Sequence, residues 1–200
     1  MVLTGPGGVG KGTVCAALQA RFPQVAVATS ATTRPPRPGE RDGAHYYFLT
    51  EDAFDAAVEA GRFLEWAVFG GHRYGTLQAE VAASCAAGRT VVLEIDVQGA
   101  RQVAALRPDA VRIFLAPPDA AALARRLEQR GADDPDRIAE RLELAREELA
   151  AADEFDHVVV NDDVPAAVTT IASILGLAAA QGSRDDGGPV QTGAPDSGTC

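Results

Sequence analysis

Close to its start, the chain carries a segment whose residue types and spacing suit phosphate binding. It follows the apolar run 2–4, precedes a helical pattern and reads Gly5-Pro6-Gly7-Gly8-Val9-Gly10-Lys11-Gly12-Thr13. A glycine-rich loop between a strand and the N-terminus of a helix presents converging backbone N–H groups, and the helix dipole adds positive potential there. Because phosphate oxygens accept from such donors, we expect residues 5–13 to hold the phosphates of a nucleotide.

Lys11 supplies the mobile cation that such a loop needs for the outer phosphates. Of the 18 lysine and arginine residues in the chain, 17 are arginines and Lys11 alone is a lysine, so this position favours the compact ammonium. The spacing matches G-x-x-x-x-G-K, although Gly12 stands where the strict motif has Ser or Thr, and Thr13 offers a hydroxyl one position later. An ordinary glycine turn is the alternative, and it would leave the lysine unexplained.

Length and composition bound the other possibilities. The 200 residues suit one domain with inserted parts. A net charge of −10 argues against nucleic-acid partners, and the apolar runs are too short for a membrane helix. Cys15, Cys85 and Cys200 form no metal-ligand pattern, and Met1 lies too close to the loop for a signal peptide. We therefore expect a cytoplasmic protein whose oligomeric state, monomer or homodimer, stays open.

Alternating strand and helix patterns predict an α/β fold with a doubly wound sheet of five parallel strands flanked by helices. Short apolar runs predict its strands at 2–4, 25–30, 91–96, 111–115 and 158–160. Periodic apolar residues predict helices at 13–21, 51–60, 78–87, 99–106, 120–130, 135–152 and 164–175. Thr50, Asp119 and Asp134 are the predicted N-caps of the helices that begin after them. Two further strand patterns, 45–49 and 63–69, flank the helix at 51–60.

The order of these patterns predicts one domain over 1–177 with two inserted parts. We expect a small α+β insertion at 34–74 and a helical lid at about 126–144. The core then consists of 1–33, 75–125 and 145–177. Residues 178–200 are rich in Gly, Ser, Asp, Pro and Thr, and we predict a disordered tail there.

A second anionic partner could be held by Arg34 and Arg37. Both lie in the proline-rich, extended stretch 31–43, and guanidinium forks at that spacing could clamp a phosphate. A stiff proline-rich linker is the alternative. Phosphoryl transfer needs two anionic partners held in line with the charge between them neutralised, so a second phosphate site favours that reaction class.

Glu65 interrupts the apolar strand 63–69. Its carboxylate lies either on a solvated face or in a pocket with a partner. A guanine edge would be a good partner, because N1–H and the N2 amino group are two donors to one carboxylate. Adenine has an acceptor at N1 and no amino group at C2. Thr76 and Ser30 could hydrogen-bond the same base.

Further along the chain, one carboxylate and three arginines could act on the transferred group. Asp96 ends the predicted strand 91–96, and parallel sheets bind ligands at such strand ends. Its carboxylate could orient Mg²⁺ through water or position Lys11. A solvated strand-end aspartate is the alternative. Arginines flank the helix break at 131–134 and could close as a lid, which we expect of Arg130, Arg137 and Arg141. An exposed helix face with Glu/Arg pairs is the alternative.

Taken together, these motifs resemble the guanylate kinases, in the nucleoside monophosphate kinase group of P-loop kinases. The resemblance covers about residues 2–175. Its motifs, in chain order, are Gly5–Thr13, Ser30–Glu40, Phe63–Trp66, Tyr74-Gly75-Thr76, Leu93–Gly99 and Val160–Asp163. The phosphate loop alone is common to many folds, whereas the whole set in this order is specific. Gly7 departs from the family, which usually has serine there.

The resemblance implies transfer of the γ-phosphoryl group of ATP to GMP, with Mg²⁺ held by phosphates and water near Thr13 and Asp96 and no direct side-chain ligation. Whether dGMP also serves stays open. It implies an ATP site at residues 5–13 and at Asn161, near the adenine. It implies that the insertion binds GMP, through Ser30, Arg34, Arg37, Tyr46, Glu65, Tyr74, Gly75, Thr76 and Glu94. The catalytic residues would be Lys11, Asp96, Arg130, Arg137 and Arg141.

Two other functions stay open at this point. Guanylate-kinase-like domains that only bind protein partners tend to lose the loop lysine or the glycine spacing, and both are present here. A related kinase with a phosphorylated sugar as acceptor would not need a base-reading Glu65 and Thr76. A GTPase is disfavoured, because the chain has no Asn-Lys-x-Asp stretch and its one lysine lies in the loop.

Overall fold

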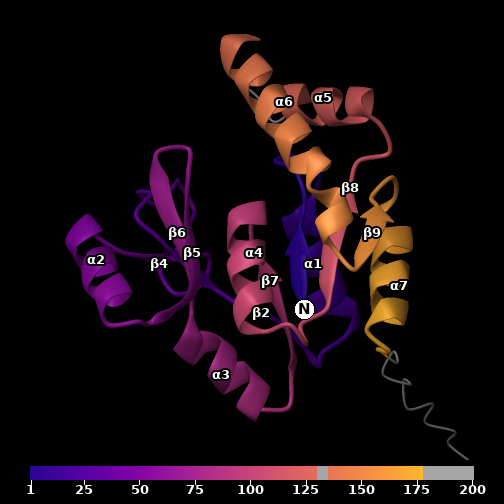
Figure 1. Cartoon of the computed structure of the whole chain (residues 1–200). Coiled ribbons are helices and arrows are strands. Elements are labelled where there is room, and N and C mark those ends of the chain that lie inside the picture. The colour runs from indigo at the N-terminus through magenta and orange to yellow at the C-terminus, as the bar shows by residue number, and fades with distance from the viewer. Residues whose placement is uncertain (130–134, 178–200) are drawn as a thin grey trace, which may run out of the picture.

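A computed structural model describes residues 1–129 and 135–177, with the backbone alone at 129 and 135–139 (Figure 1). The predicted tail at 178–200 and the predicted helix break at 131–134 lie outside the described residues. Among the helices of the described part, none combines the length and the apolar character needed to cross a membrane.

Five parallel strands form the main sheet, in the order β2-β7-β1-β8-β9, which confirms the predicted α/β fold. The strands are β1 (Val2–Thr4), β2 (Val25–Val27), β7 (Thr90–Glu94), β8 (Arg112–Ala116) and β9 (His157–Val160). Because β1 lies in the middle, the loop after it opens at the centre of the carboxyl edge, which is where open parallel sheets bind ligands.

The helices are α1 (Lys11–Arg21), α2 (Glu51–Glu59), α3 (Gln78–Ala86), α4 (Val97–Leu106), α5 (Ala120–Gln129), α6 (Pro135–Ala150) and α7 (Val164–Ile174), with a 3-10 turn at Ala152–Glu154. Thr50 and Asp119 accept hydrogen bonds from the first turns of α2 and α5, as predicted for caps. The predicted cap at Asp134 lies outside the described residues. Helices α5 and α6 lie side by side at the top of Figure 1.

Both faces of the main sheet are covered, which explains the continuous apolar sequences of its strands. Leu3 of β1 packs into a core with α1 and α7, whereas its neighbour Val2 packs on the other face against α4. Val14 and Leu18 of α1 are buried, as their spacing predicts. The sheet is therefore a rigid base for the loop that leaves β1.

A second sheet of four strands lies beside the first, in the order β4-β3-β6-β5 (Figure 1). Its strands are β3 (Ser30–Thr32), β4 (Tyr47–Phe48), β5 (Phe63–Phe69) and β6 (His72–Leu77), so they extend beyond 34–74 at both ends. Helix α2 packs on it through Phe54, which is fully buried and stacks on Phe63 with ring centroids 4.4 Å apart. This small layer faces the carboxyl edge of the main sheet through residues described below.

One strand prediction needs correction, and one strand was not predicted. The predicted strand 25–30 is two strands, because β2 ends at Val27 and Ser30 begins β3, which joins the second sheet. The stretch 74–76, which precedes a predicted helix, belongs to β6, and this strand pairs with both β3 and β5. Both differences come from pairing between distant segments, which local sequence patterns do not record.

Candidate active site

One cavity of about 670 Å³ is lined by the first turn of α1, the carboxyl end of β7, the second sheet and α6. Residues that the sequence predicts for two different ligands therefore face a common space. The predicted site residues in its lining are Gly7, Lys11, Gly12, Ser30, Tyr46, Glu65, Tyr74, Gly75, Glu94 and Asp96. The cavity thus brings together the phosphate loop and the carboxylate that we expected to read a base.

The phosphate loop turns into α1 at Gly10. This residue has a φ of 101°, in the left-handed region, and a Cβ there would lie 2.8 Å from Nδ2 of Asn161, so only glycine fits. Helix α1 begins at Lys11 and carries no acidic residue in its first turn. The positive end of its dipole therefore faces the loop without a neighbouring carboxylate on the same helix, which favours an anion.

A buried network holds the loop from behind. Asn161, only 3% exposed, donates from Nδ2 to the carbonyl oxygen of Val9 at 2.7 Å. Arg126 of α5 donates to the same oxygen at 3.2 Å and to the carbonyl oxygen of Asn161 at 2.8 Å. The residue that we expected near an adenine therefore also fixes the main chain of the loop, and α5 is tied to that loop.

Lys11 lies half-buried in the cavity with three carboxylates nearby. Its Nζ donates to the carbonyl oxygen of Gly5 at 2.5 Å. Burial lowers the pKa of Lys11, while Glu148, Glu94 and Asp96 act in the opposite direction. The ammonium is thus held close to the loop by the main chain, and its charge is partly balanced inside the cavity.

Glu65 lines the same cavity from β5 of the second sheet. It is 4% exposed, and its Oε1 accepts a hydrogen bond of 2.6 Å from Oγ1 of Thr76, which is fully buried behind it. Burial raises the pKa of Glu65 to about 7, with the Thr76 hydrogen bond acting against this shift. Of the two positions open to this carboxylate, a solvated face or a pocket, the structure has the pocket.

Gly99 makes room for the Glu65 carboxylate. A Cβ at Gly99 would lie 2.3 Å from Oε2 of Glu65, far closer than a real contact. Asp96 caps α4 by accepting from the backbone N of Gly99 at 2.8 Å. The carboxylate therefore lies against the first turn of α4, where the helix dipole favours negative charge and where any side chain would displace it.

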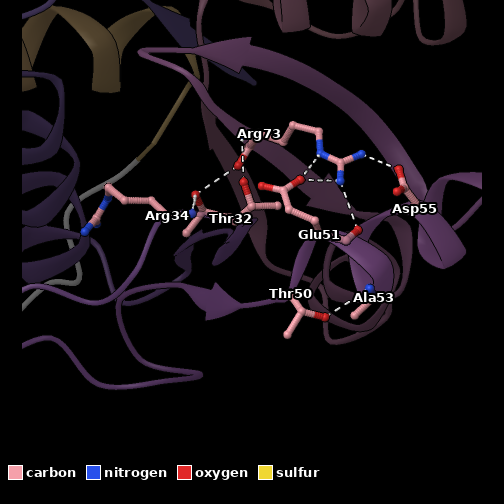
Figure 2. Close-up of polar contacts among 8 residues, drawn as sticks. Thr32, Arg34, Thr50, Glu51, Ala53, Asp55 and Arg73 are labelled. Carbon is pink, nitrogen blue, oxygen red and sulfur yellow. Dashed lines mark hydrogen bonds and ion pairs between the residues drawn. The ribbon is translucent and has the colours of Figure 1, made fainter.

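Arg34 follows β3 and is directed away from the ion pairs of Arg73 (Figure 2). Its backbone N donates to Oγ1 of Thr32 at 3.1 Å, and that hydroxyl donates to the carbonyl oxygen of Arg73 at 2.9 Å. The guanidinium, almost fully buried, lies 5.5 Å from the ring of Tyr46 and pairs with Glu40 at 2.8 Å. The end of β3 thus fixes where Arg34 leaves the sheet, beside the ring of Tyr46, which lines the cavity.

Arg73, in contrast to Arg34, has a structural role. Its guanidinium forms ion pairs with Glu51 and Asp55 of α2 (Figure 2). It also lies 4.7 Å from the centroid of the Phe54 ring. Since Arg73 belongs to β6, these contacts fasten α2 to the second sheet. The two arginines therefore differ in role, although both lie in the same small layer.

Other predicted site residues are not part of this lining. The side chains of Arg37 and Thr13 are exposed, and Arg141 lies half-buried on α6. Arg130 lies outside the described residues, as does the side chain of Arg137. Of the three predicted lid arginines, the structure therefore describes the side chain of Arg141 alone.

Three residues that the sequence did not assign to the site contact it. Arg126 holds the loop, Gly99 contacts Glu65, and Glu148 of α6 accepts from the backbone N of Gly7 at 3.1 Å. Arg126 and Glu148 lie on helices with many arginines and glutamates, so their residue types carried no signal. A glycine in the first turn of a helix, within the motif 93–99, was the available signal for Gly99.

Comparisons with known proteins identify the family. The family model described as guanylate kinase matches residues 1–178. A curated guanylate kinase from Parasynechococcus marenigrum (strain WH8102) is 52% identical over 176 residues, covering 88% of this chain and 97% of the relative. Another, from Cutibacterium acnes, is 52% identical over 177 residues, covering 88% and 89%.

Solved structures agree with these relatives. The crystal structure of guanylate kinase from Anaplasma phagocytophilum matches with a TM-score of 0.73 at 29% identity, covering 88% of this chain and 82% of that one. A shikimate kinase structure from Bacteroides thetaiotaomicron, with a TM-score of 0.50 and 16% identity over 88% of this chain and 97% of that one, shares the fold alone. The resemblance seen in the motifs is confirmed: the chain belongs to the guanylate kinase family.

Proposed function

We propose that this chain transfers the γ-phosphoryl group of ATP to GMP, giving ADP and GDP. As a member of its family it is a nucleoside monophosphate kinase, a phosphotransferase. The observation that supports the substrate pair is the common cavity that Lys11 and Glu65 both line. The curated relatives favour neither a binding module nor a sugar-phosphate kinase.

The donor nucleotide is assigned to the loop. Main-chain amides of residues 5–13 and the N-terminus of α1 would bind its phosphates, and Lys11 would exchange its bond to Gly5 for a phosphate oxygen. Asn161 is assigned to the adenine end by resemblance to the family, and its donor bond to the carbonyl oxygen of Val9 keeps it next to the loop. Positions that are fixed before the substrate arrives reduce the reorganisation needed for transfer.

The acceptor is assigned to the second sheet. Glu65, held by Thr76, would accept from the two donors of the guanine edge, and it must be ionised to do so. Arg34 would bind the GMP phosphate beside Tyr46 and Tyr74, whose ring centroids are 6.0 Å apart. The phosphate would compete with Glu40 for the guanidinium. Arg37, Ser30, Gly75 and Glu94 remain assigned to the same ligand.

Guanylate kinase activity generally requires ATP and a divalent metal, which we propose is Mg²⁺. Within 1–129 and 135–177, no group of three or more His, Cys, Asp and Glu side chains could hold a metal ion by itself. Mg²⁺ typically takes one or two carboxylates and completes its shell with water and phosphates. Asp96 lines the cavity and Thr13 offers a hydroxyl at the start of α1, so these oxygen donors fit an ion held mainly by the nucleotide. When bound, it would neutralise phosphate charge.

Transfer itself requires positioning and charge neutralisation rather than covalent help from the protein. Lys11 is assigned to the phosphoryl group from the loop side. Arg141, with Arg130 and Arg137, is assigned to it from the lid at 126–144, which would also exclude water so that the phosphoryl group reaches GMP. A cytoplasmic location is proposed on the free thiols of Cys15 and Cys85.

A coupled assay of ADP release tests the assignment, with GMP, AMP, CMP, UMP and a sugar phosphate offered as acceptors at equal concentration. We expect GMP to exceed every other acceptor in kcat/KM by at least ~100-fold, because a buried acceptor group discriminates strongly against bases that leave it unpaired. Comparable turnover with AMP or with the sugar phosphate would contradict the proposal.

A further inference from the structure

Glu148 brings a carboxylate from α6 onto the phosphate loop. Its Oε2 accepts a hydrogen bond of 3.1 Å from the backbone N of Gly7, a residue 141 positions earlier in the chain. Both residues line the cavity that also contains Lys11. The contact therefore joins the middle of the loop to a helix that lies far from it in sequence.

The backbone of Gly7 is open to this contact. A Cβ at Gly7 would meet no other atom of the described residues within 4 Å, so the space beside this residue is open. A backbone N–H carries one hydrogen and makes one strong bond. A phosphate oxygen and the carboxylate of Glu148 are both anionic acceptors, and they cannot both take this hydrogen in good geometry.

Charge makes the competition stronger. Glu148 is half-buried; burial raises its pKa, while Lys11 and the hydrogen bond from Gly7 lower it. Glu94 and Asp96 face the same cavity. A polyphosphate entering this space meets the negative charge of Glu148 directly at one of the amides it would use.

We propose that Glu148 stands in for a nucleotide phosphate on the Gly7 amide and must be displaced when the donor binds, so that it sets the affinity of the loop for the triphosphate. The inference rests on the proposed assignment of residues 5–13 to the donor nucleotide. Because Glu148 belongs to α6, its displacement also couples the filling of the loop to the position of this helix, which carries Arg141.

Isothermal titration calorimetry with the non-hydrolysable ATP analogue AMP-PNP and Mg²⁺ tests this on the full chain. Glu148→Gln keeps the shape and removes the charge, and we expect its Kd for AMP-PNP to fall by about 5- to 20-fold. Its Kd for GMP should stay within about twofold of the wild-type value. An unchanged or weaker affinity for AMP-PNP would overturn the proposal, because Glu148 would then not oppose the nucleotide.

Glu147→Gln is the matched control. Glu147 lies on the same helix, carries the same charge and is exposed, so its substitution should leave the Kd for AMP-PNP unchanged. If Glu147→Gln gained as much affinity for AMP-PNP as Glu148→Gln, the gain would come from overall charge alone. That result would overturn the role of Glu148.

Glu148→Asp keeps the charge but is one methylene too short to hold the Gly7 amide. We expect this variant to bind AMP-PNP more tightly than the wild type and less tightly than Glu148→Gln. It also keeps the proposal testable if Glu148→Gln does not fold. Weaker binding of AMP-PNP by a Glu148→Asp protein with a normal melting temperature would contradict displacement.

Lys11→Ala separates this inference from the assignment on which it rests. If Lys11→Ala leaves the Kd for AMP-PNP unchanged, the loop is not the donor site and both statements fail. If Lys11→Ala weakens binding while Glu148→Gln does not strengthen it, the donor site stands and only the displacement is wrong.

Discussion

The phosphate loop and the second sheet present different kinds of chemical groups to the cavity. At the loop end, the groups that face a ligand are main-chain amides of residues 5–13, one ammonium and a helix N-terminus. At the other end they are side chains of the second sheet and its neighbours, Glu65 and Thr76 above all. Main-chain donors recognise any phosphate, so we expect selectivity for the acceptor base to reside in the side chains of the second sheet.

Each part of the cavity contains a charged side chain that is removed from water, and the groups that stabilise the two charges differ. Lys11 has three carboxylates nearby that oppose the lowering of its pKa by burial. Glu65 is stabilised as an anion by the hydroxyl and the backbone of Thr76, and its pKa still rises to about 7. The carboxylate of Glu65 is therefore costly to ionise when no donor faces it, and this part of the cavity should respond more to pH.

The largest effect is expected at the loop end. Lys11→Ala should lower kcat by at least ~100-fold, since it removes the ammonium held at the loop, and the melting temperature should change little. Steady-state kinetics and thermal unfolding check this. Lys11→Arg is the control for charge alone: if it restores full turnover, the compact ammonium is not what the position needs.

At the other end, Glu65→Gln should lower kcat/KM for GMP by about 10- to 100-fold, because an amide cannot accept from both guanine donors. The GMP-over-AMP preference should fall by a similar factor. Glu59→Gln, on the exposed face of α2, is the matched control and should behave as the wild type. An unchanged preference in Glu65→Gln would remove this residue from base recognition.

The same substitution should stabilise the fold at pH 8. The native pKa of about 7 lies above the ordinary value of 4.5, so between these values the folded chain holds a proton that the unfolded chain has lost. Stability therefore falls as pH rises through this window, by about 1–3 kcal/mol, and Glu65→Gln should recover it. Correspondingly, KM for GMP in the wild type should rise as pH falls from 8 to 6. A pH-independent KM would contradict an ionised Glu65.

Gly99→Ala should have the smallest effect and the sharpest signature. In a helix this change normally stabilises by about 1 kcal/mol, but here its Cβ would push the Glu65 carboxylate out of place. We expect KM for GMP to rise about 5- to 10-fold with KM for ATP unchanged. In a Glu65→Ala background the clash is gone, so the same change should raise the melting temperature. Equal effects in both backgrounds would show that Gly99 does not act through Glu65.

The loop end could be predicted from the sequence because its parts are consecutive. Residues 5–13 contain the glycines, the lysine and the helix start, and the position of this loop follows from β1 lying in the middle of a parallel sheet. The main sheet was predictable for the same reason, since buried strands and capped helices alternate along the chain. The predicted length of β2 was wrong, because Ser30 pairs with Thr76 in another sheet.

For the part of the site around Glu65, the sequence predicts which residues belong to it but not how they are arranged. Glu65 is recognisable as a charge in an apolar strand, yet its position in the pocket depends on Thr76 and on the first turn of α4. The contact of Glu148 with Gly7 spans 141 positions and involves a residue type that is common on α6. Such contacts follow from how the layers pack, which residue patterns do not specify.

The proposed function requires ATP and GMP to occupy different parts of one cavity. An adenosine and a guanosine joined 5′ to 5′ by a pentaphosphate bridge tests it most directly in inhibition kinetics. We expect inhibition that is competitive with both ATP and GMP and that is weakened separately by Lys11→Ala and by Glu65→Gln. Inhibition competitive with only one substrate, and insensitive to the other end's substitution, would contradict it.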